Sequence, residues 1–288
     1  MSDTTRALLL SWEWRTSIVL ICGFFAVAYS LGWWRLRRIR GGNSAKVATV
    51  WRLVSYWAGW LILFLALVSP IEVLSGQLFT FHMIQHLMIA MFAPPLLWLG
   101  EPLPIVMWGL PLRVRLWFGR NLFAKHAPAR PYLQSVTQPF VLWGLFFLFL
   151  WGWHDANLYN LTLRQGWVHD LEHATFFYSA MGLWWHITGA GPRLHKRFSY
   201  MARIGFALAC VPANMIAGVA IAMANTVIYT YYETVPFSTF NMDVLTDQKL
   251  GGAIMWVPGS MMYVIAVVVL ITVWLNEQEK QQRARTAR

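Results

Sequence analysis

The amino-acid sequence predicts an all-α membrane protein, a bundle of seven transmembrane helices with the N-terminus outside and the C-terminus in the cytoplasm. Two observations support this fold class. Apolar residues make up 58% of the 288 residues and charged residues only 12%, and the mean hydropathy is positive. Several runs approach the length of about 20 apolar residues that spans a bilayer. A soluble chain of this length would not contain so many uncharged runs.

Seven segments are expected to form the helices of one membrane domain that covers residues 1–288. In chain order they are approximately 14–34, 47–68, 78–99, 138–153, 167–187, 203–224 and 251–275. Tryptophans mark several boundaries, as expected for interfacial anchors; they are Trp33, Trp34, Trp98, Trp151, Trp153, Trp184 and Trp185. Residues 1–14 lack the basic start and the cleavage site of a signal peptide, so a short exported tail is expected.

Proline and glycine predict irregular helices in two places. Pro94 and Pro95 lack backbone donors and are expected to kink or end the third helix near its inner end. Gly251–Gly252 and Pro258–Gly259 are expected to interrupt the seventh helix near the histidines described below. Broken membrane helices are tolerated where they line a cavity or pack on protein, so these breaks are compatible with a site that opens outward.

Basic residues determine the expected orientation. The loops 35–46, 100–137 and 188–203 and the C-terminal tail together hold 18 of the 23 lysines and arginines. Because cytoplasmic loops are enriched in these residues, this side is expected to face the cytoplasm. The net charge of +11 then follows from topology and from anionic lipid at the inner surface. No compact basic domain is recognisable, so nucleic acid is not an expected partner.

Five of the eight histidines lie at one side of the expected bundle, at the outer ends of hydrophobic segments. His82 with His86 and His169 with His173 are i,i+4 pairs, so each pair lies on one helix face. His154 follows the fourth segment at the same level. Ionisable groups are costly inside a bilayer, so a cluster of them requires a reason. If the third to fifth helices are neighbours, the five imidazoles form a candidate metal site.

Carboxylates and methionines accompany these histidines. Some of the carboxylates are expected to orient imidazoles as hydrogen-bond acceptors, and the others to be solvated at the membrane surface; they are Glu72, Asp155, Asp170, Glu172, Asp243 and Asp247. Met83 and Met88 flank the first histidine pair, while Met255 and Met262 share a face of the seventh helix. Imidazole with thioether favours copper, especially Cu(I), although methionine is also ordinary packing material in a membrane bundle.

Other features carry less information about function. His126, His186 and His195 are expected at the inner side as solvated or interfacial residues. Cys22 and Cys210 are expected at different depths, so a disulfide between them is not predicted. The sequence contains no phosphate-binding loop, which argues against nucleotide-driven transport.

The residues alone leave four interpretations open. The histidine pairs could serve only as hydrogen-bonding groups between helices. A metallochaperone would hold copper, or zinc, through imidazoles and pass it on by ligand exchange. A b-type haem protein would use facing histidines as axial ligands. A metal-dependent membrane enzyme would leave a coordination position open and use an aspartate or glutamate as base.

Three stretches of the chain, in order, carry a resemblance to a known family. Residues 81–102 contain Phe-His-Met-Ile-Gln-His and Ala-Pro-Pro-Leu-Leu-Trp-Leu-Gly-Glu-Pro. Residues 153–173 contain Trp-His-Asp and His-Asp-Leu-Glu-His, and residues 247–259 contain Asp-Gln, Gly-Gly and Met-Trp-Val-Pro-Gly. Together they resemble the motifs of the multi-span, integral-membrane cytochrome c oxidase assembly factor family called CtaG. The resemblance covers most of the chain from about residue 50 onward.

This resemblance implies a role in the maturation of haem–copper oxidases, with copper delivered at the outer face of a bacterial plasma membrane. It implies an assembly factor rather than an enzyme. The implied partners are membrane lipid, the oxidase subunit that accepts copper, and other assembly factors. Residue by residue, the implied metal-site positions are His82, His86, His154, His169 and His173, then Asp247 and Met255. Met83, beside the first pair, is added as a thioether.

Overall fold

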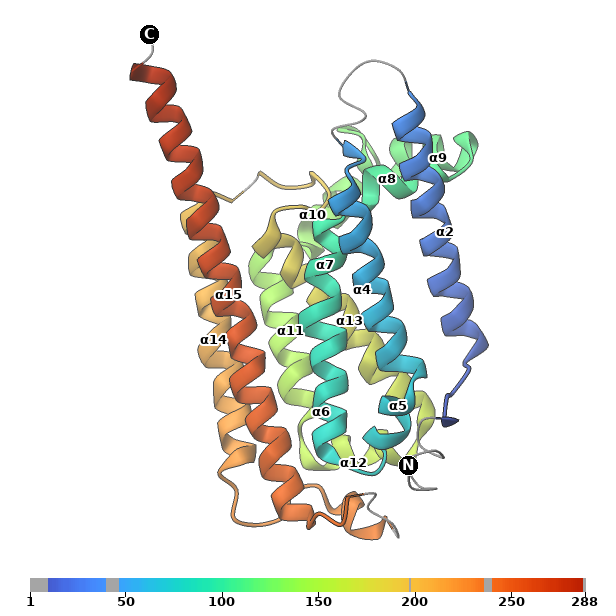
Figure 1. Ribbon diagram of the computed structural model, residues 1–288, viewed down its shortest axis with the longest axis vertical. Coiled ribbons are helices and arrows are strands. Elements are labelled where there is room, and N and C mark those ends of the chain that lie inside the picture. Colours follow the sequence, from blue (N-terminus) through green and yellow to red (C-terminus); the bar gives the residue numbers. More distant parts are fainter. Residues whose placement is uncertain (1–9, 40–46, 197, 236–239, 287–288) are drawn as a thin grey trace.

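The computed structural model describes residues 10–39, 47–196, 198–235 and 240–286. These residues form helices and no strands, so the all-α prediction is confirmed for the part of the chain that is described. The long helices stand side by side in one bundle (Figure 1). Five are long and apolar enough to cross a membrane; they are α2 (Thr16–Arg38), α4 (Val50–Val68), the run Phe79–Leu99, α14 (Tyr200–Ala222) and α15 (Val244–Thr286).

The expected fourth and fifth segments correspond to α11 (Pro139–Trp153) and α13 (Gly166–Thr188), and α11 is preceded by a short helix, α10 (Arg130–Val136). α10 and α11 meet at a bend of 53° and bring the count to six if they form one span. α13 is as long as α2 and lies inside the bundle (Figure 1). Its histidines and its glutamate make it too polar to qualify as a span by composition. Those polar side chains are buried among the other helices rather than turned to lipid.

The third expected helix continues through its prolines, in agreement with its expected range of 78–99, and changes to a π-helical turn just before them. α6 (Phe79–Leu87) leads into a π-helical turn, η1 (Met88–Phe92), and continues as α7 (Ala93–Leu99). Pro94 has no N–H to donate to the Ala90 carbonyl four residues earlier. The indole Nε1 of Trp184, on α13, donates to that carbonyl instead at 2.9 Å. The wide turn and this outside donor let the helix continue through the prolines.

The seventh expected helix is also continuous, contrary to prediction, and α15 extends beyond both expected ends. Its glycines permit close packing on α14, because a Cβ at Gly252 would come within 2.5 Å of the Ala222 nitrogen. Pro258 lies inside the helix. One turn before it, the Met255 carbonyl accepts a hydrogen bond of 2.9 Å from the buried Asn214 of α14. This hydrogen bond ties the turn before the proline to a neighbouring helix.

Short helices occupy the connections that the sequence suggested were loops. At one end of the bundle lie α5 (Pro70–Ser75), α12 (Ala156–Arg164) and the 3₁₀ turn η3 (Thr230–Thr234). At the other end lie α8 (Pro102–Gly109), α9 (Leu112–Phe118), the π-helical turn η2 (Gly119–Phe123) and α10. α8 packs tightly on α2, where a Cβ at Gly32 would meet the Ile105 carbonyl oxygen at 1.8 Å.

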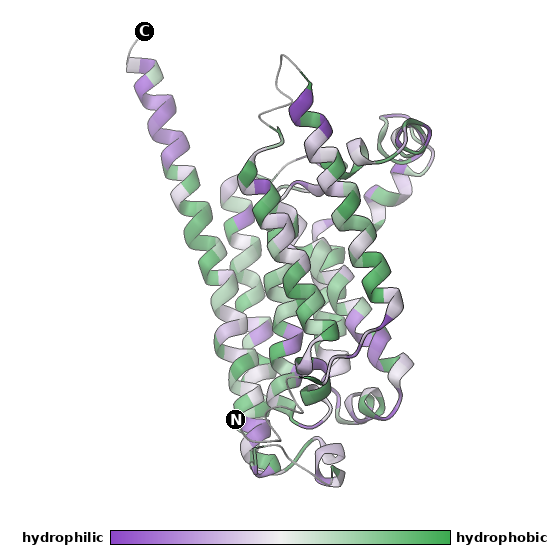
Figure 2. Cartoon of the chain, turned by 45° about the vertical axis from the view of Figure 1, so that its right-hand side comes forward, coloured by the Kyte–Doolittle hydropathy of each residue, from purple (hydrophilic) through white to green (hydrophobic). Residues whose placement is uncertain are grey.

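The basic segments gather at one end of the bundle. α8, α9 and α10 lie at the end where α15 finishes (Figure 1), and the last turns of α15 are hydrophilic while its middle is hydrophobic (Figure 2). Of the 23 lysines and arginines in the sequence, five lie outside the described residues. They are Arg6, Arg40, Lys46, Arg197 and Arg288. The candidate histidines are at the opposite end, on the first turns of α6 and α13.

Candidate metal centre

The first turns of α6 and α13 bring four of the predicted histidines together. α6 supplies His82 and His86, and α13 supplies His169 and His173, each pair spaced so that both rings lie on one helix face. All four are buried. Ring centroids of His82 and His173 are 6.1 Å apart, and those of His86 and His173 are 5.6 Å apart. The predicted adjacency of these two helices at the level of the histidines is therefore confirmed.

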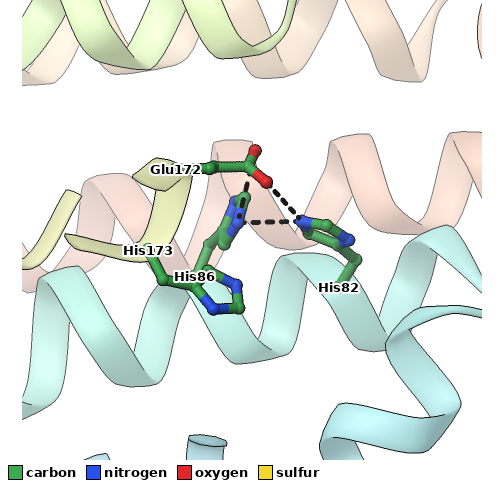
Figure 3. A group of neighbouring side chains, drawn as sticks. All are labelled: His82, His86, Glu172 and His173. Carbon is green, nitrogen blue, oxygen red and sulfur yellow. Dashed lines mark hydrogen bonds and ion pairs between the residues drawn. The ribbon is translucent and has the colours of Figure 1, made fainter. Parts of the chain in front are cut away.

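One set of four side chains, which we call the central group, consists of His82, His86, Glu172 and His173 (Figure 3). The Nε2 atoms of His82 and His86 are 2.9 Å apart. Glu172 lies beside both rings: its Oε2 is 3.6 Å from His82 Nε2, and its Oε1 is 3.6 Å from His86 Nε2. One ligand atom from each of the four residues lies within 4.8 Å of all the others. Two imidazoles and a carboxylate thus point at one small volume.

The central group fits a metal ion. The Nδ1 atoms of His82 and His86, both carboxylate oxygens of Glu172 and both ring nitrogens of His173 are buried without a hydrogen-bond partner among the described residues. Buried polar atoms normally have partners, and each one left without costs about 1–3 kcal/mol. A cation held between the two Nε2 atoms would satisfy the Glu172 oxygens and one nitrogen of His173, but not the two Nδ1 atoms, which lie across their rings from Nε2. Metal–nitrogen bonds of about 2.0–2.1 Å place two ligands about 3 Å apart, close to the observed separation of the Nε2 atoms.

A second set of side chains, which we call the outer group, consists of Glu72, His169 and His173. Its candidate ligand atoms also lie within 4.8 Å of one another, and His169 Nδ1 is 3.6 Å from a Glu72 oxygen. His169 Nε2 is buried without a hydrogen-bond partner in the described part of the chain. His173 belongs to both groups. The predicted histidine layer is therefore two overlapping sets rather than one.

Two side chains, Arg15 and Gln85, hold the carboxylate of Glu72. Arg15, just before α2, donates to one carboxylate oxygen at 2.6 Å and also bonds Asp170. Gln85 of α6 bonds the other oxygen of Glu72 and donates to the Ala66 carbonyl at 2.8 Å. Burial raises the pKa of Glu72 to about 7, while the charge of Arg15 and the hydrogen bond from Gln85 act in the opposite direction.

Three further residues predicted for the site, Met83, His154 and Met255, lie around His86. Met83, His86, His154 and Met255 line a small cavity of about 30 Å³. His154 Nδ1 lies 2.6 Å from the Leu150 carbonyl, which can only accept, so this nitrogen carries the proton. Its Nε2 therefore keeps a lone pair, and it lies 3.5 Å from the Met83 sulfur. Neither atom can donate, so a soft cation could use both as ligands.

Asp247, which the resemblance carried into the site, belongs to neither of the two groups of candidate ligands found among the described residues. Its carboxylate accepts hydrogen bonds from the backbone nitrogens of Phe79 at 2.6 Å and Thr80 at 3.0 Å. The residue before α6, Leu78, makes no side-chain cap of its own. Asp247 therefore caps the N-terminus of the helix that carries His82 and His86, which is a positioning role.

The other three histidines are away from this centre. His186 Nε2 lies 3.0 Å from the Thr137 carbonyl, and His195 Nε2 lies 2.8 Å from the Thr137 hydroxyl. Both line a cavity of about 760 Å³ at the opposite end of the bundle, between α4, α7, α13 and α15. His126 is exposed. None of the residues proposed for the metal site from the sequence is among those that line the larger cavity.

Sequence reasoning missed two residues of this centre, Arg15 and Gln85. It included Glu72 only among the carboxylates that accompany the histidines and did not expect it as a candidate ligand. Their proximity depends on the packing of α5 and the segment before α2, which no spacing rule reveals. A weak signal was present, since Glu72 is an ionisable residue inside the otherwise apolar stretch 70–74.

The fold and this centre together define a class, a helical membrane bundle with a buried histidine–carboxylate cluster at one end. Comparison with known families is more specific. The chain belongs to the cytochrome c oxidase caa3 assembly factor family (Caa3_CtaG), whose model matches residues 27–277. The resemblance seen in the sequence is confirmed, and it begins earlier in the chain than expected, within α2.

Curated relatives are known from mycobacteria. The chain is 27% identical to an uncharacterized protein of Mycobacterium bovis over 291 residues, which is 96% of this chain and 41% of that protein. An uncharacterized protein of Mycobacterium leprae is 26% identical over 279 residues, 92% of this chain and 39% of that protein. The chain thus spans about two fifths of the length of the curated relatives it matches. No solved structure matches it.

Proposed function

We propose that this protein is an assembly factor for haem–copper cytochrome c oxidase that binds copper at the outer face of the membrane and delivers it to an oxidase subunit. The family supports the association with oxidase assembly. The observation that supports metal binding is the central group, where the Nε2 atoms of His82 and His86 converge on the Glu172 carboxylate, whose two buried oxygens have no hydrogen-bond partner among the described residues. Burying these groups is costly unless an ion or a proton satisfies them.

The nature of the ligands favours copper over zinc and haem. Four histidine rings supply the nitrogen ligands that both copper and zinc accept. The lone-pair nitrogen of His154 facing the Met83 sulfur adds a soft pair, which suits Cu(I). A haem with two axial histidines needs them on opposite sides of a macrocycle. His82 and His86 instead meet at 2.9 Å, and the adjoining cavity holds only about 30 Å³.

The proposal includes a topology. Seven membrane spans, with α13 as the polar one, place the N-terminus outside and the C-terminus in the cytoplasm of a bacterial plasma membrane. The basic segments at one end of the bundle support this orientation. The histidine groups then lie in the outer leaflet, at the side where an oxidase subunit would accept copper. Membrane lipid and other assembly factors complete the expected partners.

Delivery would proceed by ligand exchange. The copper ion is the cargo. It is held by the imidazoles of the central group, which come from both α6 and α13. An acceptor with better-matched ligands replaces these imidazoles one at a time, so the ion is never without ligands. The side chains that remain near the ion, such as Glu172, balance its charge while it leaves.

The test is the metal content of the purified protein, measured by elemental analysis beside an absorption spectrum. We expect copper at a defined ratio in the wild type and its loss when His82, His86, His169 and His173 are all replaced by alanine. The matched control replaces His186 and His195, which lie at the opposite end, and should keep the metal. If the fourfold variant retains copper and still supports oxidase maturation in cells, the proposal is wrong.

A further inference from the structure

We propose that the outer group, Glu72, His169 and His173, is a second metal subsite that loads the central group, and that Arg15 closes it from outside. This inference rests on the proposed function, because it assumes that the central group binds copper. It assigns a separate role, ion entry, to Glu72, His169 and Arg15, which do not belong to the central group. Three observations support it: a shared ligand, a gradient of exposure, and an arginine bound across the entrance.

The shared ligand is His173. Its Nδ1 and Nε2 are both buried and without a hydrogen-bond partner among the described residues. Neither nitrogen is committed to holding a tautomer, so the ring can present a lone pair to either group. The ring centroid of His173 is 4.1 Å from that of His169 and 5.6 Å from that of His86. An ion held by the outer group can therefore reach the central group while it keeps His173 as a ligand.

Exposure decreases along this route from the surface inwards. The side chain of Asp170 is 62% exposed and that of Arg15 27% exposed. His169 falls to 11% and Glu72 to 4%, and the central group ends at Glu172, which is fully buried. Within the central group, His82 and Glu172 are fully buried, and His86 keeps 8% exposure. A cation coming from outside would meet the oxygen and nitrogen ligands of the outer group first.

Arg15 lies across the entrance to this route. Its guanidinium bonds Glu72 and Asp170 together, and its backbone belongs to a short segment anchored where Glu13 N donates to the Val68 carbonyl at 3.0 Å. An arginine side chain is always charged and repels a cation that approaches Glu72. The ion must displace the guanidinium from Glu72 to use that carboxylate. Arg15 and the incoming metal thus compete for one ligand.

The test measures both the number of bound ions and the rate of loading on the purified full chain. Cu(I) is offered from a coloured, moderately strong chelator, and its transfer is followed by absorbance after rapid mixing. In the wild type we expect two ions at saturation. Glu72→Gln should lose one ion and load the remaining one about tenfold more slowly, a loss in the range seen when groups around a metal are altered. Arg15→Gln should load faster than the wild type.

The matched control is Glu101→Gln. Glu101 is also a carboxylate paired with an arginine, since Arg52 bonds it at 2.7 Å, but it lies at the opposite end of the bundle. This variant should match the wild type in stoichiometry and rate. Thermal unfolding of each variant in detergent verifies that Glu72→Gln is folded, and His169→Gln provides a second variant of the outer group.

The outcomes separate the two proposals. If Glu72→Gln and His169→Gln bind as many ions as the wild type and load at the same rate, the second subsite is ruled out while copper binding stands. If the wild type itself binds no Cu(I), the proposed function fails and the second subsite fails with it. A loading rate for Arg15→Gln that is unchanged or slower overturns the role of Arg15 as a closing residue.

Discussion

His82 and His86 present their Nε2 atoms to each other at 2.9 Å, one helical turn apart on α6. At this distance one nitrogen must carry a proton that the other accepts, or both must face the same cation. Glu172 lies 3.6 Å from both atoms and supplies a negative charge to either arrangement. The pair is therefore a unit, and its two members are not expected to act independently.

This unit predicts strongly non-additive effects on copper affinity. Because both imidazoles hold one ion, His82→Ala or His86→Ala alone should remove most of the affinity. The double variant should be little worse than either single variant, as expected for residues in contact. Dissociation constants from competition with a chelator of known affinity give the comparison. Two independent losses that add in free energy would contradict a shared ion.

The methionine-lined cavity predicts selectivity between metals. Met83→Leu preserves size and apolarity but removes the sulfur that faces His154 Nε2 at 3.5 Å. We expect weaker binding of Cu(I) and unchanged binding of Zn²⁺, because thioether favours soft ions. Met255→Leu should act in the same direction. The control is Met261→Leu, an exposed methionine on the same helix as Met255. Equal losses for Cu(I) and Zn²⁺ would indicate a packing effect instead.

Close packing of α14 on α15 predicts unequal effects for two glycines of one helix. A Cβ at Gly218 would come within 2.7 Å of the backbone nitrogen of Trp256, whereas a Cβ at Gly205 would meet nothing within 4 Å. Gly218→Ala should destabilise the fold by about 1–3 kcal/mol through overpacking. Gly205→Ala should be neutral or stabilising by about 0.5–1 kcal/mol, because alanine favours helix. Thermal unfolding in a mild detergent measures both, and a lower midpoint for Gly205→Ala would refute the packing argument.

The cap on α6 predicts a loss of stability without a loss of metal. Asp247→Ala removes both acceptors for the backbone nitrogens of Phe79 and Thr80 and should cost about 0.5–2 kcal/mol. Asp247→Asn keeps one oxygen and should cost less. Both variants should bind copper in the wild-type ratio, since the carboxylate is used by the helix. The exposed Glu233 supplies a control substitution to alanine. If the Asp247→Asn variant is folded but loses copper, Asp247 is a metal ligand and not only a helix cap.

Much of the fold could be predicted from the sequence, because bilayer thickness fixes the length of apolar runs. The third segment was expected at 78–99 and is observed at Phe79–Leu99. The prediction that failed is the interruption of the seventh helix at Gly251–Gly252 and Pro258–Gly259, where α15 is continuous. Trp184 supplies the donor that Pro94 lacks, and Asn214 supports the turn before Pro258. Such compensation is tertiary, so local propensity overestimates how often a helix breaks.

The candidate site was predicted in part for a similar reason. Helical spacing was enough to place His82 with His86 and His169 with His173. It could not show that Glu172 of α13 turns towards α6 or that α5 brings Glu72 beside His169. Asp247 shows a limit of reasoning from a family motif. Such a motif includes residues that position the helices as well as residues that bind the ligand. Only the packed helices separate these two roles.

The π-helical turn at 88–92 sets the angular relation between the two halves of one membrane helix. One additional residue in a turn rotates everything after it by about 100° relative to an unbroken α-helix. The half before the turn aims His82 and His86 at α13, and the half after it aims the Trp98 indole at the Met181 carbonyl of α13, 2.6 Å away. Deleting one residue within the turn would put these two faces out of phase, so the length of this short stretch is constrained even where its side chains are interchangeable.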